Sequence, residues 1–163
     1  MGMESFFVKL LVDVDAYKDL SAFNSSIIEC LTASHFKASK ITKTMREVLL
    51  INGLIELETC EYHSKYEITL IGCFSCFLTV CTLIEELAEL FRLNYSVLSI
   101  KIAGEEFDIA TINLTDVIRD AYKEKYQWFL DNITSKTFDA SPGTFYKQLR
   151  RSKSYIGRLL SRF

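Results

Sequence analysis

The sequence of 163 residues is poor in several residue types whose abundance would indicate a particular class of protein. It has one proline, six glycines and two histidines. So few prolines and glycines exclude collagen-like and low-complexity chains, and an apolar fraction of 49% excludes a disordered one. A general base near neutral pH is most often a histidine. Because His35 and His63 each stand apart from any nucleophile at a known spacing, the sequence argues against an enzyme.

Long hydrophobic runs and catalytic motifs are also missing. Lys9 and Asp13 interrupt the first apolar stretch, and the stretch over 68–84 falls just short of a membrane span. The sequence contains no Gly-x-Ser-x-Gly, no glycine-rich phosphate loop and no His-Glu-x-x-His. We therefore expect a cytoplasmic protein with no transmembrane segment, no catalytic residues and no cofactor.

The five cysteines are an odd number with no signal peptide before them, which indicates reduced thiols. Cys73, Cys76 and Cys81 lie close enough in sequence to suggest zinc or an iron–sulfur cluster. Their neighbours are apolar, however, and no fourth ligand follows at a usual spacing. We expect these thiols to pack in the core and to bind no metal.

Hydrophobic periodicity predicts an α+β fold. The expected elements are a strand over 6–14, a helix from Asp15 to about Ser34, a short helix over Thr42–Asn52, hairpin strands over 54–62 and 65–71, a helix over 75–92, strands over 96–103 and 107–112, a helix from Thr115, a break over 138–143 and a last helix from Thr144. This order predicts a four- to five-stranded, mainly antiparallel sheet in split β-α-β (ferredoxin-like) order with added C-terminal helices. Many unrelated functions use this topology, so it does not by itself indicate one.

Two acidic groups are candidate binding residues. In the hairpin around His63-Ser64, a register that pairs Tyr62 with Lys65 places Glu56, Glu58 and Glu67 on one side of the sheet. The second group lies at an expected turn between the next two strands and consists of Glu105, Glu106 and Asp108.

The charge is divided unevenly along the chain. Residues 1–140 hold 13 Lys and Arg against 21 Asp and Glu, a net charge of −8, whereas residues 141–163 carry +6 and no acid. We therefore divide the chain into an acidic α+β domain over 1–140 and a basic amphipathic helix over 141–163, expected to pack on the same domain. One side of that helix is apolar (Phe145, Leu149, Ile156, Leu159, Leu160, Phe163), and the other is cationic (Lys147, Arg150, Arg151, Arg158, Arg162).

This helix has four interpretations. It can pack its apolar side on the domain, with its cations balancing the acidic body. Its cations can bind phosphates of nucleic acid, with Tyr146 and Tyr155 available for stacking. It can lie on an anionic membrane, although the acidic body would be repelled. It can also dock in the groove of a partner protein.

The sequence leads to three hypotheses of function. The first is a small non-enzymatic cytosolic protein of immunity, anti-defence or adaptor type that binds and occludes a protein partner, especially a basic or nucleic-acid-binding one. The second is a nucleic-acid-binding module that uses the basic helix. The third is an enzyme whose site combines scattered residues such as Asp13, His35, Tyr62 or Lys101. A homodimer is compatible with each of them.

Overall fold

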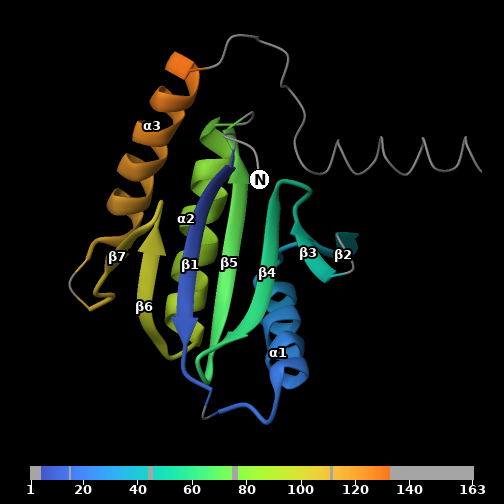
Figure 1. The fold of residues 1–163 in the computed structure, drawn as a ribbon. Coiled ribbons are helices and arrows are strands. Elements are labelled where there is room, and N and C mark those ends of the chain that lie inside the picture. The colour runs from blue at the N-terminus through green and yellow to red at the C-terminus, as the bar shows by residue number, and fades with distance from the viewer. Residues whose placement is uncertain (1–4, 15, 44–45, 75–76, 111, 133–163) are drawn as a thin grey trace, which may run out of the picture.

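A computed structural model describes residues 5–14, 16–43, 46–74, 77–110 and 112–132, which form one antiparallel sheet and three helices (Figure 1). The elements are β1 (Ser5–Val12), α1 (Leu20–Ala33), β2 (Ala38–Lys43), β3 (Arg46–Ile51), β4 (Ile55–Tyr62), β5 (Lys65–Cys73), α2 (Phe77–Asn94), β6 (Val97–Ile102), β7 (Glu105–Phe107) and α3 (Leu114–Asn132). The predicted α+β class and antiparallel sheet are confirmed. The predicted last helix, and with it the domain over 141–163, lies outside the described residues.

The sheet has seven strands in the order β2-β3-β4-β5-β1-β6-β7, and all neighbouring strands are antiparallel. The four central strands, β4-β5-β1-β6, are arranged as in a split β-α-β unit. However, β2 and β3 extend one edge and β7 the other. The prediction of four to five strands is therefore wrong, and the layout is not strictly ferredoxin-like.

The segment expected to be a short helix over Thr42–Asn52 is instead part of the hairpin β2–β3, in which Ile41 pairs with Val48. Four consecutive apolar residues, 48–51, suit a strand that buries side chains on both of its sides. Leu50 and Ile51 point in opposite directions, and both are buried. The strand ends where Asn52 and Gly53 adopt φ values of +50° and +74°.

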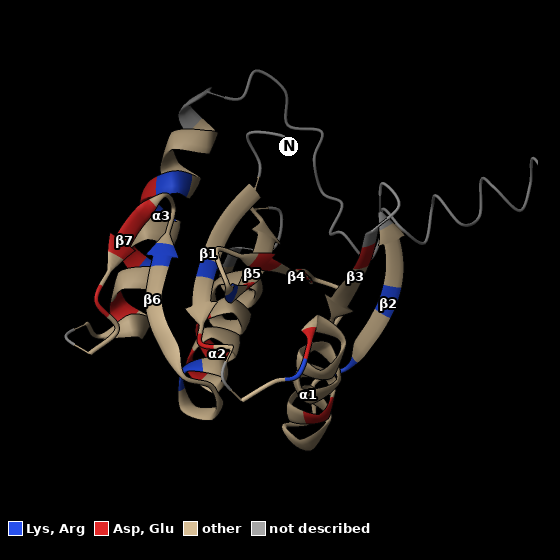
Figure 2. Cartoon of the chain, turned by 60° about the horizontal axis from the view of Figure 1, so that its bottom comes forward, with Lys and Arg blue, Asp and Glu red and all other residues tan. Residues whose placement is uncertain are grey.

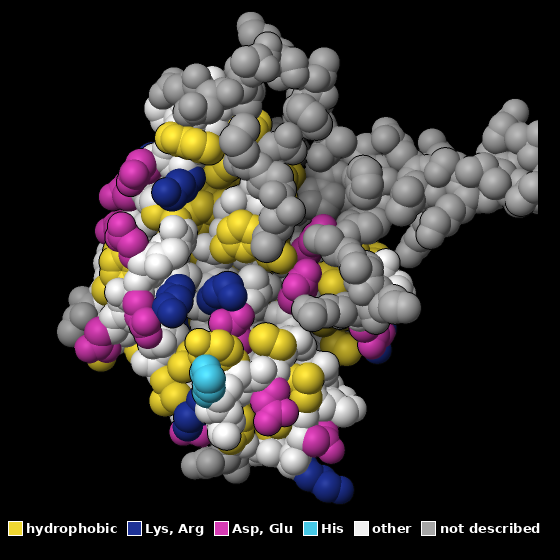
Figure 3. All heavy atoms as spheres, viewed as in Figure 1, with side chains coloured by type: hydrophobic (Ala, Val, Ile, Leu, Met, Phe, Trp, Pro, Cys, Tyr) yellow, Lys and Arg dark blue, Asp and Glu magenta, His cyan; other side chains and the backbone are white. Residues whose placement is uncertain are grey.

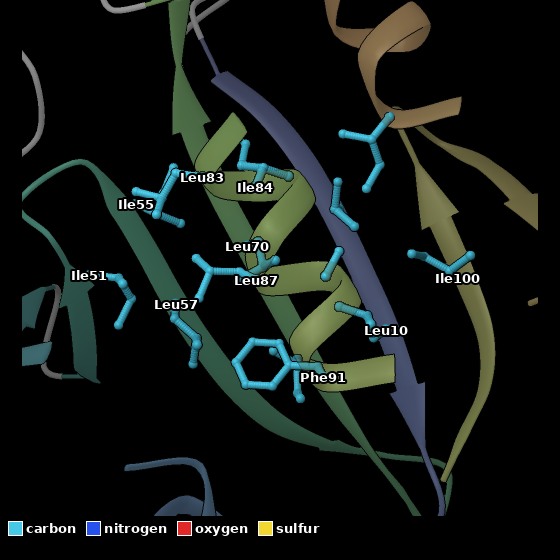
Figure 4. Packing of buried hydrophobic residues seen from close by; sticks show 14 of the residues in the cluster. Leu10, Ile51, Ile55, Leu57, Leu70, Leu83, Ile84, Leu87, Phe91 and Ile100 are labelled. Carbon is cyan, nitrogen blue, oxygen red and sulfur yellow. The ribbon is translucent and has the colours of Figure 1, made fainter. Parts of the chain in front are cut away.

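The core lies between the sheet and its helices. Along β1, every second side chain is at most 1% exposed, and Ile55 and Leu57 of β4 and Ile68 and Leu70 of β5 on the same side are equally buried. Ile84, Leu87 and Phe91 of α2 project onto this side, toward Leu57 and Leu70 (Figure 4). Helix α1 covers the neighbouring part of the same side, because Phe23 stacks on Tyr66 of β5 with ring centroids 4.7 Å apart. Asp19 caps α1 by accepting a hydrogen bond from the Ala22 amide, so this helix begins later than the predicted Asp15.

Helix α3 packs beside α2 on the same side of the sheet. Tyr122 of α3 is fully buried against Phe6 of β1, with ring centroids 4.8 Å apart. Arg119 donates two hydrogen bonds to Glu85 of α2, at 3.1 and 2.9 Å, and so holds the two helices together. All three described helices therefore cover one side of the sheet and leave the other without a described helix.

The hairpin β4–β5 has the register expected from the sequence, with Tyr62 opposite Lys65 and Leu57 opposite Leu70. His63 and Ser64 form its two-residue turn at φ values of +48° and +57°. Two positive φ values define the type I′ turn, which matches the twist of a hairpin and normally contains Asn and Gly. The backbone of His63 and Ser64 therefore adopts a conformation that favours glycine.

We expect Ser64→Gly to raise the free energy of unfolding by about 1 kcal/mol, because glycine has no side chain to disfavour a positive φ. Ser64→Val serves as the opposing control, since a β-branched side chain is least compatible with this conformation. Urea denaturation of both variants measures the effect. Equal stabilities of the two variants would contradict the assigned turn.

Candidate functional site: an uncovered face of the sheet

The side of the sheet opposite the helices is called the open face here. Its side chains alternate with the core residues along each strand. They comprise Phe7, Lys9 and Leu11 of β1, Glu67, Thr69 and Ile71 of β5, Glu56 and Glu58 of β4, and Lys101 of β6. Figure 3 shows this face, where cationic, acidic and apolar side chains are interleaved over the middle of the sheet.

Lysines occupy the centre of the open face. Lys9 and Lys101 lie directly opposite each other on β1 and β6, which places two like charges side by side. Carboxylates offset this repulsion on both sides: Lys9 Nζ lies 2.8 Å from Glu67 Oε1, and Lys101 Nζ lies 3.5 Å from Glu106 Oε2. Figure 2 shows the basic positions on β1 and β6 and the acidic positions on the neighbouring β7. Thr69 also donates to Glu67, at 3.1 Å. Glu67, predicted as one of three acids on this side of the sheet, therefore forms an ion pair with Lys9 within the open face.

A groove of about 770 Å³ lies along β4 and is called the acidic groove here. It is lined by residues of the open face and also by Leu20 and Asn24 of α1, on the other side of the sheet. Among the described residues that line it, five are glutamates and Lys9 is the one Lys or Arg. The glutamates are Glu47, Glu56, Glu58, Glu61 and Glu67, and apolar contact is offered by Phe7 and Ile71. Glu56 is 7% exposed and Glu58 is partly buried. The structure thus brings together the first predicted acidic group on the open face. The strand registers place Glu47 and Glu61, which line the same groove, on the helical side of the sheet.

The second predicted acidic group lies elsewhere. The turn before it consists of Ala103 and Gly104, at φ values of +52° and +101°, so Glu105 and Glu106 belong to strand β7 and not to the turn. Asp108 follows β7 and accepts a hydrogen bond from the Ala110 amide at 3.0 Å. Three strands separate β7 from β4, so these residues and the acidic groove do not form one site.

A small apolar cluster also lies on the open face. Leu50 is opposite Glu56 in the register of β3 and β4, so it points to the same side of the sheet, as do Val48 and Ile41. These three side chains are 6%, 2% and 7% exposed and are separate from the main core. Sequence reasoning missed them because it placed Val48 and Leu50 in a helix.

Two of the scattered residues considered for an enzyme lie at one site: Tyr62 and Lys101 line a hollow of about 500 Å³ together with Lys9 and Glu67. Asp13 and His35 do not line it. Asp13 pairs with Lys65 at 3.1 Å, and His35 follows α1 at a φ of +63°. The predicted basic residues Lys147, Arg150, Arg151, Arg158 and Arg162 lie outside the described residues.

The described thiols of the predicted cysteine group lie in different elements. Cys73 ends β5, Cys81 is buried in α2, and Cys76 lies outside the described residues. Burial, together with the hydrogen bond that Cys81 donates to Glu85, raises the pKa of this thiol to about 12. Cys81 therefore stays protonated at neutral pH and is a poor nucleophile. The described part of the chain brings no three His, Cys, Asp or Glu side chains into a metal-binding cluster.

Comparisons with protein-family models, curated proteins and solved structures found no match. Of the helices that the structure describes, none has the length and apolar character needed to cross a bilayer. The functional argument therefore depends on the residues of the open face.

Proposed function

We propose that this protein binds a basic segment of a partner protein in the acidic groove and thereby occludes that segment. The observation that carries the proposal is the ratio of five glutamates to one lysine among the described lining residues. Such a groove attracts Lys and Arg side chains, and the charge of −8 over residues 1–140 would steer a cationic partner toward it. Basic segments are common in nucleases and other nucleic-acid-binding proteins, which suits an immunity, anti-defence or adaptor role.

The groove favours a peptide over nucleic acid. Glu56 and Glu58 would repel phosphates, whereas Phe7 and Ile71 offer apolar contact to side chains. Nearby titratable groups are held in pairs, Lys9 with Glu67 and Lys65 with Asp13, which suits binding better than proton transfer. The described cysteines form no disulfide with one another, and this supports the proposal that the protein acts in the reducing cytosol.

The proposal is tested by fluorescence anisotropy with a labelled peptide of mixed Lys, Arg, Gly and Leu. We expect binding that weakens with added salt, and no comparable binding of a Glu-rich peptide or of single-stranded oligonucleotides. Glu58→Lys reverses a charge that lines the groove and is expected to weaken peptide binding about tenfold. Glu105→Lys makes the same charge change at the far edge of the sheet and is expected to change binding less than about twofold.

Equal losses in the two variants would show that only net charge matters and would reject the groove as the site. Tighter binding of the oligonucleotide than of the basic peptide would favour the nucleic-acid hypothesis instead.

A further inference from the structure

The hollow of about 500 Å³ that Tyr62 and Lys101 line differs in charge from the acidic groove and is called the cationic hollow here. Among the described residues that line it, Lys9, Lys101 and Lys125 are basic and Glu67 is the one acid, a net charge of +2. Residues 1–140 together carry −8. The hollow therefore concentrates cations in a domain that is otherwise acidic.

The strand register explains why two of these lysines lie together. Lys9 of β1 is directly opposite Lys101 of β6, which places their Cβ atoms roughly 5 Å apart. Cationic side chains accordingly lie together over the middle of the open face (Figure 3). Glu67 pairs with Lys9 and Glu106 pairs with Lys101, each from the outer side. An anion between the two ammonium groups would offset the repulsion that remains.

An apolar wall and open space lie beside these lysines. Phe7 lines the hollow, and its carbonyl oxygen accepts a hydrogen bond from the Ala103 amide at 3.1 Å. This bond places the Ala103-Gly104 turn next to Phe7. Chain neighbours aside, no described atom lies within 4 Å of a Cβ placed at Gly104, so the turn leaves room there. The volume is in the range of small-molecule sites, which combine apolar walls with a few polar groups.

The charge of the hollow selects the chemistry of its ligand. The ammonium group of lysine is a compact point charge with three donors and commonly binds phosphate. The described lining residues include no arginine, the residue whose planar fork matches a carboxylate. A phosphomonoester carries about −1.5 to −2 at pH 7, which matches the net charge of +2.

We propose that the cationic hollow binds a small organic phosphomonoester with a flat apolar body. The phosphate contacts Lys9 and Lys101, Lys125 adds positive potential, and the apolar body lies against Phe7. The ligand is a small molecule rather than a nucleic-acid strand, because Glu105 and Glu106 on one side and the acidic groove on the other would repel further phosphates. This site does not depend on the proposed binding of a basic peptide.

Isothermal titration calorimetry of the full chain with 1-naphthyl phosphate tests the inference. We expect binding at least about tenfold tighter than that of inorganic phosphate, which lacks the ring, or of 1-naphthoate, which carries a single charge. Lys101→Gln should weaken binding of naphthyl phosphate about tenfold, since it removes one charge-assisted hydrogen bond. Lys125→Gln, on another element of the hollow, should weaken it about threefold.

Lys40→Gln is the matched control. It makes the same charge change at an exposed position of β2, on the opposite edge of the sheet from β7, and should alter binding less than about twofold. Equal losses in Lys101→Gln and Lys40→Gln would show that only net charge matters and would overturn the site.

Three further results would overturn the inference. Naphthyl phosphate that does not bind would reject the hollow as a phosphate site. Naphthoate or inorganic phosphate that binds as tightly would reject the phosphomonoester or its apolar body. Displacement of naphthyl phosphate by a tighter-binding single-stranded oligonucleotide would make the hollow part of a nucleic-acid site. Because the basic peptide is titrated separately, failure of the proposed function leaves this inference standing, and the reverse also holds.

Discussion

Replacing Tyr122 by alanine is expected to lower the free energy of unfolding by about 4 kcal/mol, as large-to-small changes of buried aromatic residues do. Tyr122 is fully buried, and its ring contacts Phe6 and Phe74 at centroid distances of 4.8 and 5.2 Å. Its hydroxyl donates to the Cys73 carbonyl oxygen at 2.7 Å. The substitution therefore removes a buried contact between α3 and the end of the sheet. Chemical denaturation monitored by circular dichroism measures the loss.

Tyr122→Phe is the matched control, because it keeps the ring and removes only the hydroxyl. We expect it to cost about 1 kcal/mol, the usual net value of one hydrogen bond. If alanine and phenylalanine cost the same, the ring packing described for α3 would be wrong.

Replacing Gly72 by valine is expected to lower the free energy of unfolding by about 3 kcal/mol, at the upper end of the usual cost of overpacking. A Cβ atom at Gly72 would lie 2.6 Å from Val80 Cγ1 and 2.7 Å from Ile84 Cδ1. Glycine at this position therefore lets α2 pack closely against β5. The same denaturation measurement reports the effect.

A double-mutant cycle tests this steric explanation directly. Val80→Ala opens space beside position 72, so Gly72→Val should cost less in that background than in the wild type. Additive effects would contradict the close approach of α2 to β5. Both the Tyr122 and the Gly72 predictions test the packing of helices on one side of the sheet, which is what leaves the open face available.

Local patterns predicted the β4–β5 hairpin well. Alternation of apolar and acidic residues fixed which side of the hairpin is buried, and pairing Tyr62 with Lys65 gave the correct register. The tightness of the turn was harder to predict, since His63-Ser64 lacks the usual Asn or Gly. Here the pairing of the two strands outweighs the sequence preference of the turn.

The β2–β3 hairpin was mistaken for a helix because short apolar runs do not distinguish the two structures. Two signals in the sequence favoured strands. Val48–Ile51 is apolar at every position, as in a strand buried on both sides, and the Asn52-Gly53 pair that follows is typical of a hairpin turn. Because of this mistake, the apolar cluster formed by Ile41, Val48 and Leu50 was not predicted.

The acidic residues of the candidate site could be found from the sequence, but their surroundings could not. Lys9 lies 58 residues from Glu67 along the chain, and the two meet because β1 lies between β5 and β6. The order of strands that are far apart in the sequence depends on the packing of the whole domain rather than on a local sequence pattern. For the same reason, the division of the two acidic groups between β4 and β7 became visible only in the fold.

The most direct test of the central claim is an NMR titration of the ¹⁵N-labelled full-length protein with the basic peptide. The account predicts that amide shifts change most in β4, β5 and β1, around Glu58, Thr69 and Lys9, and change little in α2 and α3. Shift changes confined to the outer surfaces of α2 and α3, with β4 and β5 unaffected, would contradict it.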